Sequence, residues 1–466
     1  MSTGSSSQQL HQALAQIPAL ATRIVGGDAD GPVRLPLAPE AVVEALALEL
    51  PKQGRSLDEV LDLLGAVLEA TPNAAGGRFW NQLFGGREAA ATIADMLASL
   101  ANNSMYTYKV AGPMVLIENL VLQRMAEIAG FADGEAVLAP GGSVSNLAAL
   151  LVARNVAMAD ARAFGVASPV GRIYASSEAH YSIRKAAMIA GIGRDHVRKI
   201  AVDAAGRMDP DELDRQLTRD RAGGLLPIQV VATAGTTVRG AFDPIDALAD
   251  VCGAHGVWLH VDGAFGGTLL LSPTTRPLLR GLERADSFVW DAHKLMGVPL
   301  LCSAVFVRER GLLTTHLGES ASYLFQGDSD ALNPGTRSLQ CGRRNDALKL
   351  WAAWQHHGDL GWSARVDRQR ALALRLAALV EQRPGLRLCE PPPSLNVCFF
   401  VPDVPSEAIC ARLGSERLQL VGHGDVADVV AIRAAVVDPD HDEHDLRTLL
   451  DDIETVAASL RAERQA

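Results

Sequence analysis

Three features that could serve one chemical task occur in order along the chain: a glycine-rich turn at 140–146, Asp262 and Lys294. Lys294 lies in the apolar run WDAHKLMGVPLLCSAVFV and is one of only six lysines among 43 basic residues. Burying a charged ammonium without a partner costs several kcal/mol. Unlike an arginine, a lysine can lose its proton and form a Schiff base with an aldehyde. Lys294 therefore indicates covalent chemistry, although a lysine whose stem follows apolar surface to solvent would give the same pattern.

Asp262 and the glycine-rich turn fit the same chemistry. Asp262 ends the apolar, β-branched stretch VWLHVD, which predicts a buried strand. An acid at that point would keep the ring nitrogen of pyridoxal phosphate (PLP) protonated, although it could also cap the next turn. The turn PGGSVSN opens a helix with amides and hydroxyls that suit a phosphate. Found in this order, the turn, the acid and the lysine indicate a PLP site more strongly than any of them alone.

The elements that must position these residues lie between about 76 and 350, where β-rich runs alternate with helical stretches. The runs are GRIYAS (171–176), HVRKIAV (196–202), PIQVVATA (227–234), VWLHVDGA (257–264), SFVWDA (287–292) and SAVFVRE (303–309). This alternation predicts a largely parallel sheet with helices on both faces. Ligands of such sheets bind at the carboxyl ends of the strands, where Thr236, Asp262 and Lys294 fall.

The rest of the chain suggests three units. Residues 1–75 predict an N-terminal helical segment with too little core to stand alone, and its last helix should begin at the capping box Ser56–Glu59. Residues 76–350 form the predicted large domain. Residues 351–466 predict a small α+β domain, with a long helix followed by the alternating stretches LNVCFFVP and VVAIRAAVV.

Composition narrows the functional class. With 466 residues and 48% hydrophobic content, the chain should form two or three domains and expose enough apolar surface to oligomerise. A net charge of −11 argues against nucleic-acid binding. No run of 18 apolar residues predicts a membrane span, and the first residues lack the basic region of a secretory signal. We therefore expect a cytoplasmic enzyme.

Neither cysteines nor histidines indicate a metal site. The six cysteines are scattered without a Cys-x-x-Cys pair, which argues against both a disulfide framework and a zinc knuckle. His441 and His444 lie among acids at 438–450, but acids at this spacing suit a helix start, with Asp438 or Asp440 as its cap. No metal is predicted.

Nine stretches of the chain resemble the group II PLP-dependent amino acid decarboxylases, above all glutamate decarboxylase and cysteine sulfinate decarboxylase. They are FWNQL (79–83), NSMYTY (103–108), PGGSVSN (140–146), SSEAHYS (176–182), ATAGTTVRGAFDPI (232–245), HVDGAFGG (260–267), WDAHKLMGVPLLCSA (290–304), ASYLFQ (321–326) and QCGRRNDALKLW (340–351). The resemblance implies a fold-type I, aminotransferase-like enzyme with a mostly parallel seven-stranded sheet. It also implies PLP-dependent α-decarboxylation of an acidic amino acid by a homodimer with shared active sites, in which the N-terminal segment packs on the partner.

The same resemblance implies roles for individual residues. Lys294 would hold the cofactor, Asp262 would keep its ring protonated, and His180 would stack on the ring and orient the substrate. Further cofactor contacts would come from Gly142, Ser143, Ser145, Thr233, Thr236, Ala264 and His293. The substrate would be bound by Asn81, Gln82, Tyr106 and Arg433, whose guanidinium suits a carboxylate. Ordinary structural roles stay open, because threonines near turns often bond to the backbone.

Departures from the family pattern leave the substrate open. Lys109 replaces an acid, Asp291 stands where the animal glutamate enzymes have asparagine, and Tyr106 favours the cysteine sulfinate branch whereas GVP (297–299) favours the glutamate branch. The loop after ASYLFQ lacks the tyrosine that relatives use as a proton donor. Decarboxylation of a non-standard or non-acidic amino acid, and an oxygen-dependent aldehyde-forming reaction, are therefore alternatives. Another PLP reaction class and a catalytically silent binding protein also stay open.

Overall fold

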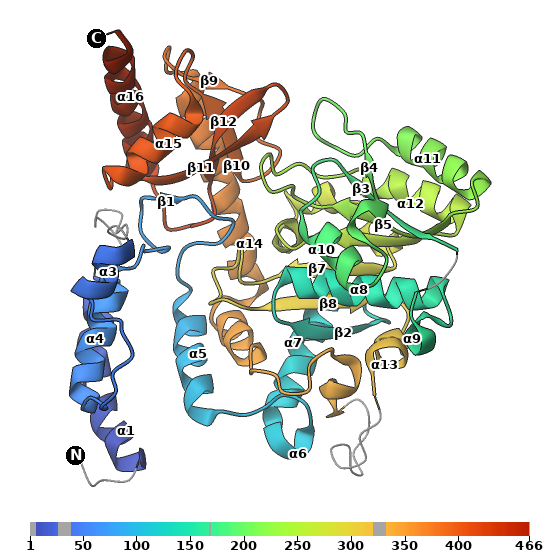
Figure 1. The fold of residues 1–466 in the computed structure, drawn as a ribbon, viewed down its shortest axis with the longest axis horizontal. Helices are drawn as coiled ribbons and strands as arrows, with labels where there is room; N and C mark the ends of the chain where they lie inside the picture. The colour runs from blue at the N-terminus through green and yellow to red at the C-terminus, as the bar shows by residue number, and fades with distance from the viewer. Residues whose placement is uncertain (1–5, 27–38, 167–168, 320–331, 466) are drawn as a thin grey trace.

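The computed structural model describes residues 6–26, 39–166, 169–319 and 332–465, which are arranged around two β-sheets (Figure 1). The larger sheet has seven strands in the order β2-β8-β7-β6-β5-β3-β4. Their bounds are β2 (Glu135–Ala139), β3 (Gly171–Ser176), β4 (Val197–Ile200), β5 (Leu226–Thr233), β6 (Trp258–Asp262), β7 (Ser287–Asp291) and β8 (Ser303–Val307). Strand β8 runs antiparallel to both neighbours, and all other neighbours are parallel. The mostly parallel seven-stranded sheet is confirmed.

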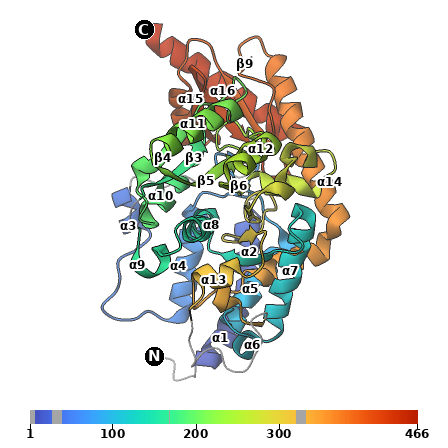
Figure 2. The same cartoon turned by 90° about the vertical axis from the view of Figure 1, so that its right-hand side faces the viewer.

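Successive side chains of the central strands point to opposite faces of this sheet. On one face, Val231 and Val289 pack under α8 and α10, whereas the preceding Val230 and Phe288 join the core on the other face. Figures 1 and 2 show helices on both sides of the sheet. The helices of this part are α5 (Ala89–Ala101), α6 (Tyr108–Ala111), α7 (Pro113–Ala129), α8 (Gly142–Ala157), α9 (Ala161–Phe164), α10 (Ser182–Ile189), α11 (Pro210–Ala222), α12 (Ile245–His255) and α13 (Leu312–Leu317).

The described residues of the N-terminal segment form four helices. Its helices are α1 (Ser6–Leu14), α2 (Ile17–Val25), α3 (Pro39–Ala45) and α4 (Leu57–Ala70), and α1, α3 and α4 lie along one side of the molecule in Figure 1. The capping box at the start of α4 is confirmed: the Ser56 hydroxyl accepts the Glu59 N–H, and the Glu59 carboxylate accepts the Ser56 N–H at 2.7 Å.

The second sheet has five strands in the order β1-β11-β12-β10-β9. It contains β1 (Phe79–Trp80), β9 (Arg387–Leu388), β10 (Asn396–Phe400), β11 (Leu420–Val426) and β12 (Val429–Ala435), and it packs with α14 (Ala347–Glu381), α15 (Ser406–Ser415) and α16 (Glu443–Gln465). Strand β1 pairs with β11 across more than 300 residues of sequence, and α14 crosses position 350. The division at 75/76 and 350/351 remains a prediction.

The acid-rich stretch before α16 differs in detail from the expectation. The cap is Asp442, which accepts the N–H groups of His444 and Asp445, so the prediction of Asp438 or Asp440 is wrong. His441 is buried, with its ring 3.9 Å from that of Trp80. Stacking on Trp80 accounts for the burial of His441. In the described part of the chain, neither His441 nor His444 belongs to a group of three potential metal ligands.

A search of the described helices finds none that is both long enough and apolar enough to cross a bilayer.

Candidate active site

A cavity of about 320 Å³ opens at the carboxyl ends of the central strands β5, β6 and β7, between the two sheets. Because these parallel strands end at the same edge of the sheet, residues far apart in sequence meet there. The lining includes these residues predicted from the sequence: Gln82, Gly142, Ser143, His180, Thr233, Asp262, Ala264, His293, Lys294 and Arg433.

Lys294 reaches the cavity with 24% of its side chain exposed, so its amine is accessible to a ligand. Its Nζ lies 3.8 Å from Oδ2 of Asp291, and the same oxygen lies 3.6 Å from Nε2 of His293. Asp291 thus lies within ion-pair distance of two basic residues of the cavity. A Cβ at Gly142 would come within 2.7 Å of this carboxylate, so only glycine fits there.

Asp262 is held by two hydrogen bonds on its buried carboxylate. Its Oδ1 accepts the N–H of Ala264 at 3.2 Å, and its Oδ2 accepts the side-chain amide of Asn146 at 2.9 Å. Hydrogen bonds to the ionised form favour a charged carboxylate. The arrangement keeps Asp262 ready to face a cationic ring nitrogen.

Asn146 belongs to a chain of hydrogen bonds with one possible direction. Its Oδ1 can only accept, so Nε2 of His260, at 2.9 Å, must donate. Burial lowers the pKa of His260 to about 4, so the ring is neutral and Nδ1 accepts from the Ser287 hydroxyl at 2.8 Å. The indole N–H of Trp258 donates to that hydroxyl, also at 2.8 Å. Every donor therefore points toward Asp262, an arrangement in which successive hydrogen bonds strengthen one another.

His180 lies half-buried at the start of α10. Its Nδ1 accepts the N–H of Ser182 at 3.3 Å, so a neutral ring carries its proton on Nε2. Burial lowers the pKa of His180, and the nearby charge of Asp262 opposes that shift. Near neutral pH the ring is therefore an uncharged group that can stack on another ring and still donate a hydrogen bond from Nε2.

The N-terminus of α8 forms one wall of the cavity. Gly141 has φ 91°, and helix geometry leaves the N–H groups of Gly142 and Ser143 without intrahelical acceptors. Such a helix start binds anions through its amides and its dipole. His293 lies beside it, with its Nδ1 held against the backbone of Cys302, 2.9 Å from the carbonyl oxygen and 3.1 Å from the nitrogen.

Arg433 brings an unpaired positive charge to the cavity from strand β12. Its side chain is only 8% exposed, with Nη1 donating to the Thr237 carbonyl at 3.0 Å and Nη2 to the Asn81 carbonyl. Its Nε has no partner, and no carboxylate of the described residues lies within 4.0 Å. Burial lowers the pKa of Arg433. A Cβ at Gly422, its cross-strand neighbour, would come within 3.0 Å of the guanidinium.

Four residues predicted from the sequence lie outside the lining of this cavity. The hydroxyl of Ser145 lies 2.7 Å from that of Ser303, and the Thr236 hydroxyl accepts the Ala241 N–H at 3.0 Å. Asn81 and Tyr106 contribute backbone carbonyls, to Arg433 and to the Gly335 N–H respectively. Their predicted roles stay predictions. Lys109 is exposed on α6 and also lies away from the lining, and ASYLFQ (321–326) lies outside the described residues.

Sequence reasoning overlooked several residues that line the cavity, among them Asn146, Ser182, Thr237 and Leu301. A signal for Asn146 was present. It lies four residues after Gly142 on α8, and residues at that spacing share one face of a helix. An expected phosphate contact at Gly142 therefore places Asn146 at the same cavity, one turn further along.

The residues present fit PLP. The cavity offers one amine, a hydrogen-bonded carboxylate and an anion-binding helix start, which match the aldehyde, the ring nitrogen and the phosphate of that cofactor. The buried hydroxyl of Thr233, at the carboxyl end of β5, has no hydrogen-bond partner among the described residues. A ligand with polar ring substituents would satisfy it.

Comparison with known proteins agrees with this geometry. Residues 39–401 match the pyridoxal-dependent decarboxylase conserved domain. The chain belongs to this family. It is therefore a PLP-dependent decarboxylase, a lyase of amino acid metabolism.

Three similar proteins illustrate the relationship. Cysteine sulfinic acid decarboxylase of Rattus norvegicus is 44% identical over 370 residues, which cover 78% of this chain and 75% of the relative. Acidic amino acid decarboxylase GADL1 of Homo sapiens is 35% identical over 445 residues, 91% of this chain and 85% of the relative. The crystal structure of mouse CSAD in apo form matches with a TM-score of 0.93 and 35% identity over 97% of this chain and 99% of that one.

Proposed function

We propose that this decarboxylase acts on an acidic amino acid, such as cysteine sulfinate, aspartate or glutamate, and releases CO₂ and the corresponding amine. The observation that carries this proposal is the buried guanidinium of Arg433, which faces the cavity without a carboxylate partner among the described residues. A buried cation without a partner is costly, and an anionic substrate group would compensate for it. The names of the rat and human relatives, which act on such acids, support the same substrate class.

PLP, when bound, draws electrons from the bond that breaks at Cα into its ring. Lys294 would hold its aldehyde and Asp262 its ring nitrogen. Ser143 and His293, with the N–H groups at the start of α8, would hold its phosphate. Ala264 and His180 would cover the two faces of the ring. Each of these residues lines the cavity, which supports the assignment.

Orientation of the substrate decides which bond breaks. A guanidinium fork fixes a carboxylate in two directions at once, so Arg433 would orient the substrate as well as attract it. Its own position is fixed by hydrogen bonds to the carbonyls of Thr237 and Asn81. Binding energy at this end of the substrate can therefore be used to hold the reactive pose. Gln82 lines the same cavity and would contribute a polar contact to the substrate.

A proton must return to Cα after CO₂ leaves. His180 lines the cavity, so we assign its imidazolium form as the donor in place of the tyrosine that relatives use. The ring would take up this proton from solvent and return to the neutral form when the proton passes to Cα. This assignment distinguishes the main proposal from the aldehyde-forming alternative, in which the carbon reacts with oxygen instead.

The test is a balance of products. Purified holoenzyme incubated with cysteine sulfinate, aspartate and glutamate should release CO₂ and amine in equal amounts, without peroxide. A panel with lysine, tyrosine and tryptophan should show much slower release. Aldehyde and peroxide in place of amine would establish the oxygen-dependent alternative, and faster turnover of a neutral or basic amino acid would refute the role given to Arg433.

We further propose a cytoplasmic homodimer. The exposed face of α5 carries Ile93, Met96, Leu97 and Leu100, each at least 46% exposed, and such a contiguous apolar surface is typical of an interface. All six cysteines are free, which fits a reducing compartment. Sedimentation should give a mass twice the 49.4 kDa of one chain. A monomer in concentrated holoenzyme would refute the dimer.

A further inference from the structure

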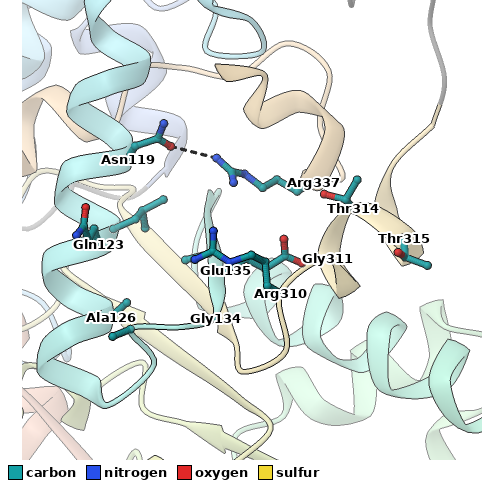
Figure 3. Close-up of a pocket in the computed structure, with 13 residues that line it drawn as sticks. Asn119, Gln123, Ala126, Gly134, Glu135, Arg310, Gly311, Thr314, Thr315 and Arg337 are labelled. Carbon is teal, nitrogen blue, oxygen red and sulfur yellow. Dashed lines mark hydrogen bonds between the residues drawn. The ribbon is translucent and has the colours of Figure 1, made fainter. Parts of the chain in front are cut away.

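A second cavity, of about 580 Å³, lies away from the active site (Figure 3). It is bounded by α7, the start of β2, α13 and the short 3₁₀ helix η6 (Pro334–Arg337), and it shares no lining residue with the cavity that contains Lys294. Figure 3 shows the side chains of Arg310 and Arg337 extending into it. No role in decarboxylation explains two guanidinium groups at this place.

Arg337 is the main observation. Its Nη2 donates to Oδ1 of Asn119 at 3.1 Å, whereas its Nε is buried and has no hydrogen-bond partner. Within the described parts of the chain, no carboxylate lies within 4.0 Å of this guanidinium. Burial lowers the pKa of Arg337 because desolvation disfavours the charged guanidinium. Such a cation is stabilised when an anion binds beside it.

The surrounding charges leave the cavity positive. Arg310 forms no ion pair with another described residue, so two positive groups face one negative group, Glu135. That carboxylate already accepts the N–H of Leu313 at the start of α13. Glu118, which lies near Arg337, is paired with Arg343 at 2.9 Å. Both nearby acids thus have other partners, and neither forms an ion pair with Arg310 or Arg337 that an added anion would have to displace.

We propose that this cavity binds a small oxyanion, the carboxylate or phosphate group of a metabolite, between Arg310 and Arg337. Guanidinium forks match planar carboxylates and phosphates, and Gln123 and Thr314 offer additional donors in the lining. The bound anion would connect α7 with η6 and α13.

Thermal unfolding of the holoenzyme tests the proposal, because bound PLP keeps added phosphate out of the active site. Inorganic phosphate is titrated into wild-type holoenzyme, and succinate is titrated into Arg433→Gln holoenzyme so that the substrate-binding arginine cannot account for a response. Each titration is compared with sodium chloride at equal ionic strength. At least one of the two should raise the unfolding temperature in a saturable manner. A response to phosphate alone or to succinate alone identifies which group the cavity prefers.

Two variants locate the effect. Arg337→Gln should raise the half-saturating anion concentration at least tenfold. The exposed Arg310→Gln should raise it several-fold and leave turnover without added anion within twofold of wild type. Because Arg310 is exposed, Arg310→Gln tests the site even if Arg337→Gln fails to fold. The matched control is Arg219→Gln on the exposed face of α11, which should respond as wild type. Equal shifts with chloride, or wild-type responses in both Arg310→Gln and Arg337→Gln, would overturn the proposal.

Discussion

Two of the cavities among the described residues, the active-site cavity and the arginine-lined cavity, differ in chemistry more than in size. The smaller, of about 320 Å³, contains an amine, two acids and a directed hydrogen-bond chain, whereas the larger, of about 580 Å³, contains arginines that bind but cannot form covalent bonds with an aldehyde. The smaller lies where parallel strands end, and the larger lies beside the antiparallel edge strand β2. The comparison teaches that the reactive groups and the strand ends, rather than cavity volume, identify the active site.

The largest effect should come from the amine that distinguishes the first cavity. Lys294→Ala should lose turnover by about a thousandfold or more, because no other lysine lines the cavity to anchor the cofactor. The visible absorbance of the PLP-loaded protein should change with it. Lys199→Ala, an exposed lysine on β4, is the control and should behave as wild type. Equal activity in the two variants would contradict the assignment.

The second-largest effect should come from removing the guanidinium of Arg433, which is proposed to bind the substrate carboxylate. Arg433→Gln should raise KM for acidic amino acids roughly 10- to 100-fold, the value of a hydrogen-bonded charge of about 1.5–3 kcal/mol. A smaller change in kcat is expected if Arg433 mainly binds. Arg412→Gln, which breaks an exposed ion pair with Glu463, should leave both constants unchanged. A lower kcat with unchanged KM would instead place Arg433 in the chemical step.

The hydrogen-bond chain behind Asp262 should have an intermediate effect. Asn146→Ala should weaken PLP binding about tenfold or more, because Asp262 loses a donor that stabilises its charge. The pH dependence of the PLP absorbance band should shift as well, a change that simple loss of stability would not produce. Asn103→Ala, which removes a hydrogen bond to Val110, is the matched control. An unchanged spectrum in Asn146→Ala would contradict the proposal that Asn146 stabilises the charge of Asp262.

The smallest effect concerns acid stability. His260 has a pKa of about 4 in the folded protein and about 6.5 unfolded, so the unfolded chain binds the extra proton between these values. Its contribution to the free energy of unfolding, roughly 3 kcal/mol, is present above pH 6.5 and is lost as pH falls toward 4. Buried Asp243, whose pKa is raised to about 6, acts in the opposite direction, so the comparison must use a variant.

Denaturant unfolding of His260→Gln and wild type at pH 7 and pH 4.5 measures the contribution of His260 to the free energy of unfolding. The difference in stability between the two proteins should shrink at the lower pH. His423→Gln, an exposed histidine on β11, should show no such convergence. A constant difference across this range would mean that His260 is not held neutral by its surroundings.

Sequence reasoning predicted the parts of this structure that depend on local pattern. Six strands of the large sheet, the capping box of α4 and the placement of Lys294 and Asp262 at strand ends are all confirmed. Strand β2 was missed because EAVLA is short and lies at an edge. The pairing of β1 with β11 was missed because it joins residues about 340 positions apart, and local patterns carry no information on such pairing.

Finer features of the site depend on side-chain direction, which composition does not encode. Thr236 and Thr237 are neighbours, but the hydroxyl of Thr236 accepts a backbone N–H while Thr237 lines the cavity. Ser145 turns toward Ser303, although it follows Ser143 by only two residues on α8. Half a turn of helix thus separates a cavity residue from a packing residue, and only the assembled fold shows which is which.

The most direct test of the central claim compares a half-buried lysine with a fully buried one. Lys294 opens to the active-site cavity, whereas Lys349 is fully buried and paired with Asp346 at 2.9 Å. Borohydride treatment of PLP-loaded enzyme should make the cofactor's attachment permanent, and peptide mass spectrometry should then find the pyridoxyl mass on Lys294 alone. A label on Lys349 or any other lysine, or no label in active enzyme, would contradict the account.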